Sequence, residues 1–416
     1  MISGFRALNF RRRQFATATL VANALHPPSN YWLGAPAMFG GWLTGELAPH
    51  LLAVTAADAL REVMKRKDTP GLALATASAA GLGFLIRQSM KAEEVVDTAL
   101  REALGPNYPR QPAPRDADVD LTTPWYQLAF PLVLRNADVE IIKDVAYGKP
   151  GDLTSLDVYR RKHAMRDAAP VLVHIHGGMW MSGDKKYEGL PLMLHMAAHG
   201  WVCVNVNYRL CPKHPFPAQI IDIKRAIAWV RAHGEEYGAD PSYIAVSGGS
   251  AGGHLAALAA LTPGDPEYQP GFEDADTTVA AAVPHYGIYD FAAVSGTDHA
   301  IKRRNRFLAR FILKKDPVAD HEDFERASPL LRASADAPPF FVIHGANDTG
   351  VEVTEARYFV QRLRQLSRRP VAYAELPGAQ HAFDFFPSIR SAHVLGAVER
   401  FLDWSFAQHG AKTGGG

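Results

Sequence analysis

The stretch Ser247-Gly248-Gly249-Ser250-Ala251-Gly252-Gly253 decides the fold of this 416-residue chain. It follows an apolar run, Tyr243–Val246, that is predicted to be a strand, and it precedes a helix-like run, His254–Leu261. A serine at a tight strand-to-helix turn between glycines is held in a strained backbone with its hydroxyl exposed, as in the GxSxG nucleophile elbow. A phosphate-binding turn is the alternative, but no lysine follows as a P-loop requires. Ser250 is therefore the predicted nucleophile.

Around this turn, apolar runs of strand length alternate with amphipathic helical stretches. This alternation predicts an α/β fold with a mostly parallel eight-stranded sheet and helices on both faces. The predicted strands are Val139–Val145, Leu153–Val158, Val171–His174, Val202–Asn207, Tyr243–Val246, Ala280–Tyr286, Phe340–Ile343 and Val371–Glu375.

A second glycine-rich segment, His174-Ile175-His176-Gly177-Gly178-Met179-Trp180, lies at the end of another predicted strand. The backbone N–H groups of Gly177 and Gly178, together with the amide of Ala251, are predicted to form an oxyanion hole. His176 is expected to orient this loop. Met179 and Trp180 are predicted to contact the substrate.

A hydrolytic triad needs an acid and a base after late strands, in the order Ser, Asp, His. Asp348 follows the predicted strand Phe340–Ile343, and His381 follows Val371–Glu375. His381 is predicted to take the proton of Ser250, and Asp348 to hold the tautomer of His381. Other carboxylates that could replace Asp348 are Glu352, Asp384 and Asp290.

Residues from about 139 to 405 resemble the hormone-sensitive-lipase-like, HGG-motif branch of the α/β-hydrolase fold. The matching motifs are 176–179 for the HGGG loop, 208–218 for YRLAPEHPFPA, 248–253 for GDSAGG, and the loops of Asp348 and His381. The resemblance implies a serine carboxylesterase for short- to medium-chain acyl esters, with an acyl-serine intermediate. It implies a small-molecule ester substrate, no cofactor and no metal. Asp222 resembles a structural position of the family, buried among polar partners.

Two positions depart from the family: Met179 replaces the third glycine, and Gly249 replaces the aspartate before the serine. The segment HGG-x-W followed by Gly183-Asp184-Lys185 is also similar to kynurenine formamidases. An amidase or arylformamidase with the same triad is therefore the alternative function. A binding module that has lost catalysis is disfavoured, because all three triad candidates are present.

The composition is that of an ordinary globular protein, with 47% hydrophobic and 21% charged residues. A formal net charge of +1 gives no general attraction for nucleic acid, which is excluded as a partner. Cys203 and Cys211 are expected to be free thiols, one in a strand and one in the following loop.

The chain is predicted to have a helical, partly apolar N-terminal extension, residues 1–115, and a catalytic domain, residues 116–416. The proline-rich run 107–120 is the expected linker. Met90–Leu104 reads as an exposed amphipathic helix. Cap elements over the active site are expected at about 124–135 and 291–331.

The first residues imitate an export signal, since Arg11, Arg12 and Arg13 precede the apolar stretch Phe15–Leu25. That stretch is short and interrupted by Thr and Asn, so a cytoplasmic protein is expected and an exported form is disfavoured. Residues 31–88 contain further apolar stretches, which are expected to make peripheral contact with a membrane. A homo-oligomer is left open.

Overall fold

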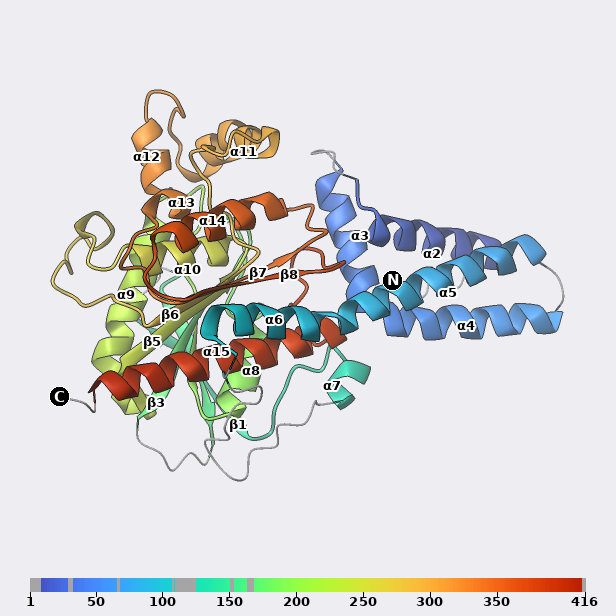
Figure 1. The fold of residues 1–416 in the computed structure, drawn as a ribbon, viewed down its shortest axis with the longest axis horizontal. Coiled ribbons are helices and arrows are strands. Elements are labelled where there is room, and N and C mark those ends of the chain that lie inside the picture. Colours follow the sequence, from blue (N-terminus) through green and yellow to red (C-terminus); the bar gives the residue numbers. More distant parts are fainter. Residues whose placement is uncertain are drawn as a thin grey trace.

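The computed structural model of the chain describes residues 9–28, 33–65, 68–106, 108, 125–149, 153–162 and 168–413. Its centre is an eight-stranded sheet in the order β1-β2-β4-β3-β5-β6-β7-β8 (Figure 1). β1 and β2, and β2 and β4, pair antiparallel, whereas all other neighbours pair parallel. The strands are β1 Val139–Ala146, β2 Ser155–Arg161, β3 Ala169–Ile175, β4 Val202–Val206, β5 Ala239–Gly249, β6 Ala281–His285, β7 Phe340–Gly345 and β8 Val371–Leu376. The predicted α/β-hydrolase fold is confirmed.

Helices cover both faces of the sheet, because the central strands are apolar on both sides. Val171, Val173 and Ile175 of β3 belong to one core cluster, and Leu172 belongs to the other. The first cluster contains side chains of α9 (Ala218–His233), α10 (Ala251–Leu261) and α14 (Val353–Leu366). The second contains side chains of α6 (Ala92–Leu104), α8 (Leu190–Ala198) and α15 (Ile389–Thr413).

The placement of α6 corrects the prediction that Met90–Leu104 is an exposed helix. Val96 and Leu100 are fully buried in the same core cluster as β8 and α15, so α6 covers the sheet and is not an exposed helix of the extension. The expected linker lies almost entirely outside the described residues, and so does the boundary near residue 116. In space, the hydrolase core therefore includes a helix from the predicted extension.

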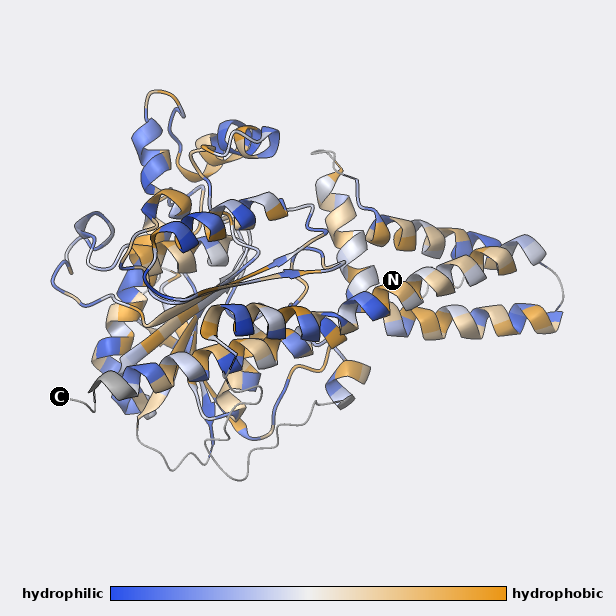
Figure 2. Ribbon diagram, in the orientation of Figure 1, coloured by the Kyte–Doolittle hydropathy of each residue, from blue (hydrophilic) through white to orange (hydrophobic). Residues whose placement is uncertain are grey.

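Four further helices form a bundle that projects away from the sheet (Figure 1). They are α2 (Phe10–Leu25), α3 (Gly34–Glu46), α4 (Ala48–Lys65) and α5 (Thr69–Met90). We call α2–α5 the N-terminal helices. Their own core is small and consists of Val21, Ala24, Ala48, Leu82 and Leu85. Many of their apolar side chains are exposed. Figure 2 shows the apolar residues of α2, α4 and α5 as orange stretches of the ribbon.

The expected cap segments contain short helices. The first holds α7 (Trp125–Ala129), and His50 Nε2 of α4 lies 3.1 Å from the carbonyl oxygen of Ala129. The second holds α11 (Asp298–Arg303), the π-helix η3 (Arg304–Ile312), α12 (His321–Arg326) and α13 (Pro329–Arg332). Short 3-10 helices also follow α9 and α10, at η1 (Gly234–Tyr237) and η2 (Pro266–Tyr268). Cys203 and Cys211 are both buried, as thiols and not as a disulfide.

Candidate active site

Ser250 lies at the turn between β5 and α10. Its backbone has φ 57° and ψ −117°, a strained conformation for a residue with a side chain. Glycines make the turn possible: a Cβ on Gly252 would lie 1.9 Å from the carbonyl oxygen of Ile175, and one on Gly248 would lie 2.6 Å from it. The turn therefore has the strand-turn-helix geometry of a nucleophile elbow.

Asp348 and His381 are brought together by the turns after β7 and β8. His381 Nδ1 lies 2.7 Å from Asp348 Oδ2. The other carboxylate oxygen, Oδ1, accepts hydrogen bonds of 2.8 Å from the backbone N–H groups of Gly350 and Val351. When Nδ1–H donates to Asp348, the lone pair of His381 is on Nε2. His381 in this tautomer can accept a proton.

Both side chains are buried, at 7% exposure for Asp348 and 8% for His381. Burial alone would raise the pKa of Asp348, but the charge of His381 and hydrogen bonds from His344 and His381 lower it well below the ordinary value. Burial would lower the pKa of His381, but the charge and hydrogen bond of Asp348 raise it. The pair thus combines an ionised carboxylate with an imidazole of increased basicity.

Tyr286 connects the loop of His381 to the turn of Ser250. Its ring centroid lies 4.6 Å from that of His381. Its hydroxyl oxygen lies 2.7 Å from where a Cβ on Gly249 would be. The backbone N–H of Ser250 donates to the carbonyl oxygen of His285, the residue before Tyr286, at 3.0 Å. The three predicted triad residues therefore gather at the carboxyl edge of the parallel strands.

The rival carboxylates are engaged elsewhere. Glu352 pairs with His299, at 3.1 Å between Oε1 and Nδ1. Asp384 accepts hydrogen bonds from His285 and Tyr286. Asp290 accepts from the backbone N–H groups after it, at residues 294 and 295. Asp348 is thus the carboxylate bonded to His381 Nδ1.

The loop after β3, residues 176–183, carries the predicted oxyanion glycines. Gly178 has φ +99°, and a Cβ there would lie 2.2 Å from the carbonyl oxygen of Ser182. The His176 ring stacks on Tyr208 with centroids 4.3 Å apart, and the Tyr208 hydroxyl donates to the His176 carbonyl at 2.9 Å. Burial lowers the pKa of His176 to about 4, so this ring is neutral. These contacts hold the loop in place.

One predicted oxyanion amide is already bonded. The backbone N–H of Gly177 donates to Glu188 Oε1 at 2.7 Å, which corrects the expectation that it faces an empty site. The amides of Gly178 and Ala251, in contrast, donate to no group in the described part of the chain. Two of the three predicted amides are therefore free to bind a substrate oxygen.

Glu188 was missed in the sequence analysis. Burial raises its pKa to about 8, and the hydrogen bond from Gly177 opposes this only in part. Its Oε1 lies 2.9 Å from where a Cβ on Gly249 would be. The Glu188 carboxyl group therefore fills space beside position 249, where the resembled family has aspartate. The glycine at position 249 indicates that another acid could occupy the place of the family's aspartate. No local sequence motif predicts that this acid is Glu188.

The two predicted substrate contacts differ in exposure. The Met179 side chain is 54% exposed. Trp180 is 1% exposed, and its indole N–H donates to His254 Nδ1 at 3.2 Å while its ring packs edge-on against Phe291. Trp180 is therefore a core residue, which corrects its predicted contact with substrate. Asp222, as expected, is buried and binds Arg209 through two nitrogens.

The N-terminal helices bond directly to the loop that carries Asp348. The Thr349 hydroxyl donates to the carbonyl oxygen of Gly34 at 2.9 Å, and Asn347 Nδ2 donates to that of Ala24 at 3.1 Å. Near the His381 loop, the buried Arg390 at the start of α15 forms an ion pair with the buried Glu46 of α3. These contacts make α2 and α3 part of the support of the site.

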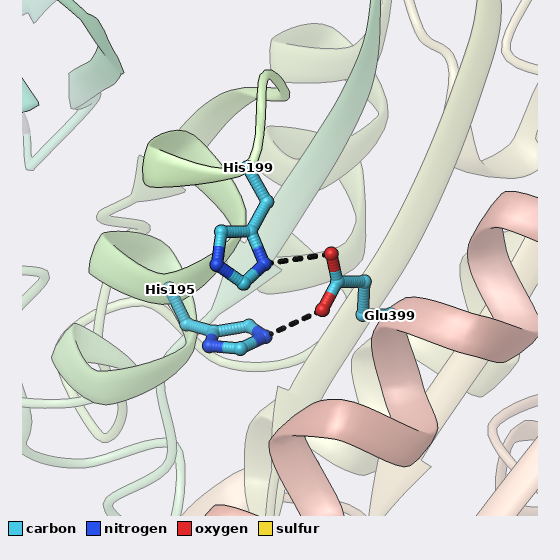
Figure 3. Close-up of side chains that lie close together, drawn as sticks. All are labelled: His195, His199 and Glu399. Atoms are coloured by element: carbon cyan, nitrogen blue, oxygen red, sulfur yellow. Dashed lines mark hydrogen bonds and ion pairs between the residues drawn. The ribbon is translucent and has the colours of Figure 1, made fainter. Parts of the chain in front are cut away.

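The groups around Ser250 can together supply a nucleophile, a proton acceptor, an orienting carboxylate and two amide donors. This set is sufficient for acyl transfer without a metal or cofactor. In the described residues, a group of His and Glu side chains with the spacing of metal ligands lies elsewhere, between α8 and α15 (Figure 3).

Comparison with known proteins agrees with this geometry. The BD-FAE family matches residues 156–363, a segment that includes the glycine loop, Ser250 and Asp348. The chain belongs to the BD-FAE family. The segment matched by BD-FAE ends before His381.

Two relatives of this BD-FAE member come from Mycobacterium tuberculosis. The chain is 51% identical over 274 residues to the probable carboxylic ester hydrolase LipM, covering 65% of this chain and 63% of LipM. It is 44% identical over 273 residues to the esterase LipQ, covering 65% of this chain and 64% of LipQ. The chain thus spans less than two thirds of the length of these relatives.

Solved structures share the fold. Esterase B from Lactobacillus rhamnosis superimposes with a TM-score of 0.56 at 20% identity, covering 67% of this chain and 91% of that one. Butyrate-bound esterase Est2 from Thermogutta terrifontis gives 0.52 at 26% identity, covering 66% and 94%.

Proposed function

We propose that this protein is a serine carboxylesterase for short- to medium-chain acyl esters. Ser250 is the nucleophile, His381 the general base and Asp348 the carboxylate that orients it. The observation that carries the proposal is the 2.7 Å contact between His381 Nδ1 and Asp348 Oδ2 beside the strained turn of Ser250. The substrate is a small molecule, and nucleic acid has no role.

The reaction proceeds through two acyl transfers. His381 Nε2 takes the proton of the Ser250 hydroxyl as Oγ attacks the ester carbonyl carbon. The amides of Gly178 and Ala251 stabilise the resulting oxyanion, each contributing roughly 3 kcal/mol. The bond to the alcohol oxygen then breaks, and His381 delivers the proton to the leaving alcohol. Water attacks the acyl-serine by the same route and releases the carboxylic acid.

An ester is favoured over a formamide because LipM and LipQ are named as an ester hydrolase and an esterase. A panel of p-nitrophenyl esters with acyl chains of increasing length, together with N-formylkynurenine, measures this preference. We expect the highest kcat/KM on a short or medium acyl ester. A higher kcat/KM on the formamide than on every ester would contradict the ester assignment.

The assignment of Ser250 is tested with Ser250→Ala. Loss of the nucleophile should lower kcat by about a thousandfold or more, with an unchanged circular dichroism spectrum. Ser242→Ala is the matched control, because Ser242 is an exposed serine at the other end of β5. Full activity in Ser250→Ala would refute the mechanism.

We further propose that the protein is cytoplasmic and touches a membrane through the N-terminal helices. Exposed apolar side chains support this, among them Phe15 of α2, Leu60 and Met64 of α4, and Phe84 of α5. By length and composition, Thr69–Leu104 is also apolar enough to cross a membrane. However, its last third is α6, which is packed between β8 and α15, so peripheral contact is favoured over spanning.

Binding to vesicles tests this contact. The full chain should co-sediment with phosphatidylcholine–phosphatidylglycerol vesicles, and Leu60→Glu with Met64→Glu should abolish the binding. Val318→Glu is the control, because Val318 in the cap is as exposed as Met64, at 78% against 77%. Absence of the full chain from the vesicle pellet would refute the membrane proposal. Sedimentation velocity without vesicles tests the homo-oligomer, which stays a prediction.

A further inference from the structure

Two histidines and one glutamate converge between α8 and α15 (Figure 3). Both helices pack on the opposite face of the sheet from α10. His195 Nε2 lies 2.8 Å from Glu399 Oε2, and His199 Nδ1 lies 2.7 Å from Glu399 Oε1. One ligand atom from each residue lies within 4.8 Å of the other two. The three side chains therefore point at one small volume.

This cluster is separate from Ser250. Both α8 and α15 begin near the edge of the sheet where the active-site loops lie, and both run back along it. His195 is five residues into α8 and Glu399 ten residues into α15, so they lie roughly 8 and 15 Å along their helices. The esterase mechanism uses none of the three groups.

We propose that His195, His199 and Glu399 form a binding site for a divalent transition metal, with Zn²⁺ as the best match. His195 in the last turn of α8 and His199 at its C-cap are four residues apart, and a carboxylate from a second helix completes a His₂Glu set. The two imidazole nitrogens favour Zn²⁺ over Ca²⁺ and Mg²⁺, because these hard cations take oxygen ligands.

The burial and spacing of the three side chains suit such a site. Glu399 is 5% exposed at its side chain, whereas His195 is 23% exposed, so water can reach the fourth position of a tetrahedral ion. Bonds of about 2.0–2.1 Å at a tetrahedral centre separate ligand atoms by about 3.3 Å. The N–O distances to the two Glu399 oxygens, 2.7 and 2.8 Å, are about half an ångström shorter than this separation, and the three ligand atoms already lie within 4.8 Å of one another.

The same atoms make hydrogen bonds when no metal is bound. His195 then donates from Nε2–H and His199 from Nδ1–H to Glu399. In the metal-bound form these two nitrogens use their lone pairs, and each neutral ring carries its proton on the other nitrogen. Metal binding thus replaces two hydrogen bonds with three coordinate bonds, and it ties α15 to α8 as a structural clamp.

The test uses full-length protein without a histidine tag, stripped with EDTA. Addition of ZnCl₂ at about a hundred times its Kd should raise Tm by about 3 °C, and EDTA should reverse the rise. Co²⁺ should give the visible absorption of a tetrahedral site. Ester turnover, measured after excess metal is removed, should be the same for stripped and Zn²⁺-loaded protein.

His195→Ala and Glu399→Gln should remove the Zn²⁺-dependent rise in Tm and the Co²⁺ spectrum. The metal-dependent difference is the readout, because either variant can also lower Tm by losing a hydrogen bond. His233→Ala is the matched control, since His233 pairs with one carboxylate, that of Glu236, at the same 2.8 Å, and no metal-ligand group of the described residues includes it. The site would be overturned if Zn²⁺ did not raise the Tm of wild type. It would also be overturned if Zn²⁺ raised the Tm of wild type and of His195→Ala equally.

Because turnover and metal binding are separate readouts, failure of the esterase assignment leaves this result interpretable. A Zn²⁺-dependent change in turnover that His195→Ala abolishes would overturn the purely structural role.

Discussion

The carboxyl group of Glu188, in the loop beside Ser250, has a strongly raised pKa. Burial raises its pKa to about 8 in the folded chain, against an ordinary value near 4.5. An acid with a raised pKa is stabilising below its unfolded pKa, and this contribution is lost as the pH rises from about 4.5 to 8. In the folded protein, Glu188 is therefore neutral at pH 6 and ionised at pH 9.

Glu188→Gln should remove this pH dependence, since the amide keeps the shape without a charge. The difference in the free energy of unfolding, variant minus wild type, should be about 1–3 kcal/mol larger at pH 9 than at pH 5. Urea unfolding at both pH values measures the difference. Glu236→Gln, at an exposed position, serves as control, and an equal effect of Glu188→Gln at pH 5 and 9 would count against a raised pKa.

Asp348→Asn tests the role of the carboxylate bonded to His381. The base must be neutral to accept a proton, so activity falls as the pH drops through the pKa of His381. Asp348 raises that pKa; without its charge, the acid limb of the kcat/KM profile should move to lower pH. We also expect kcat to fall by about 10³- to 10⁴-fold.

Glu352→Gln is the control for Asp348→Asn, because Glu352 pairs with His299 and not with His381. Full activity in Asp348→Asn would contradict the orienting role of Asp348. If the acid limb of the kcat/KM profile of Asp348→Asn did not move and Glu352→Gln were inactive, Glu352 would take that role.

At the scale of single residues, the sequence predicted the location of site residues that directly follow strands. It did not predict the location of residues whose surroundings come from distant parts of the chain. Ser250, Asp348 and His381 each come directly after a strand, so their meeting at one edge of the sheet could be expected. Glu188 approaches from a loop with no motif. The burial of Trp180 depends on His254 and Phe291, which are distant in the sequence.

At the scale of elements, the same substitution should have opposite effects in α10 and α15. A Cβ on Gly252 would meet the backbone of β3 at 1.9 Å, whereas one on Gly396 would have no heavy atom within 4 Å among the described residues. Gly252→Ala should therefore destabilise the protein by several kcal/mol. Gly396→Ala should stabilise it by about 0.5–1 kcal/mol, because alanine favours a helix interior.

Thermal unfolding of the two glycine variants measures both effects. A tolerated Gly252→Ala would mean that β3 and α10 are not packed as closely as described. A destabilising Gly396→Ala would mean that this face of α15 is covered.

The strands were easier to predict than the placement of the helices. Apolar runs bounded by turns mark β3 to β8, because strands buried on both faces leave a continuous apolar signal. The amphipathic pattern of α6 shows one apolar face but does not say what covers it. Its partners are β8 and α15, whose sequences lie about 270 and 300 residues later.

At the scale of the whole molecule, a buried ion pair between Glu46 and Arg390 joins the N-terminal helices to α15. Glu46→Ala would leave the Arg390 guanidinium buried without its partner, which should cost about 3–5 kcal/mol of stability. Ester turnover should also fall, since α3 supports the loop of Asp348. Asp336→Ala removes an exposed pair with Arg368 and should change stability by less than about 1 kcal/mol.

Denaturant unfolding and turnover, measured on the same samples, check this coupling. Wild-type stability and turnover in Glu46→Ala would show that the helices are attached independently of the site.

The bonds from Asn347 and Thr349 to α2 and α3 have a practical consequence for anyone engineering the enzyme. Trimming an apolar leader is a common way to improve expression, and a cut in the proline-rich segment looks convenient here. Such a shortened protein would leave both donors without their acceptors at the carbonyls of Ala24 and Gly34, and would lose α6 from the face of the sheet. A soluble variant is better sought by replacing exposed apolar side chains of α4 while keeping the whole chain.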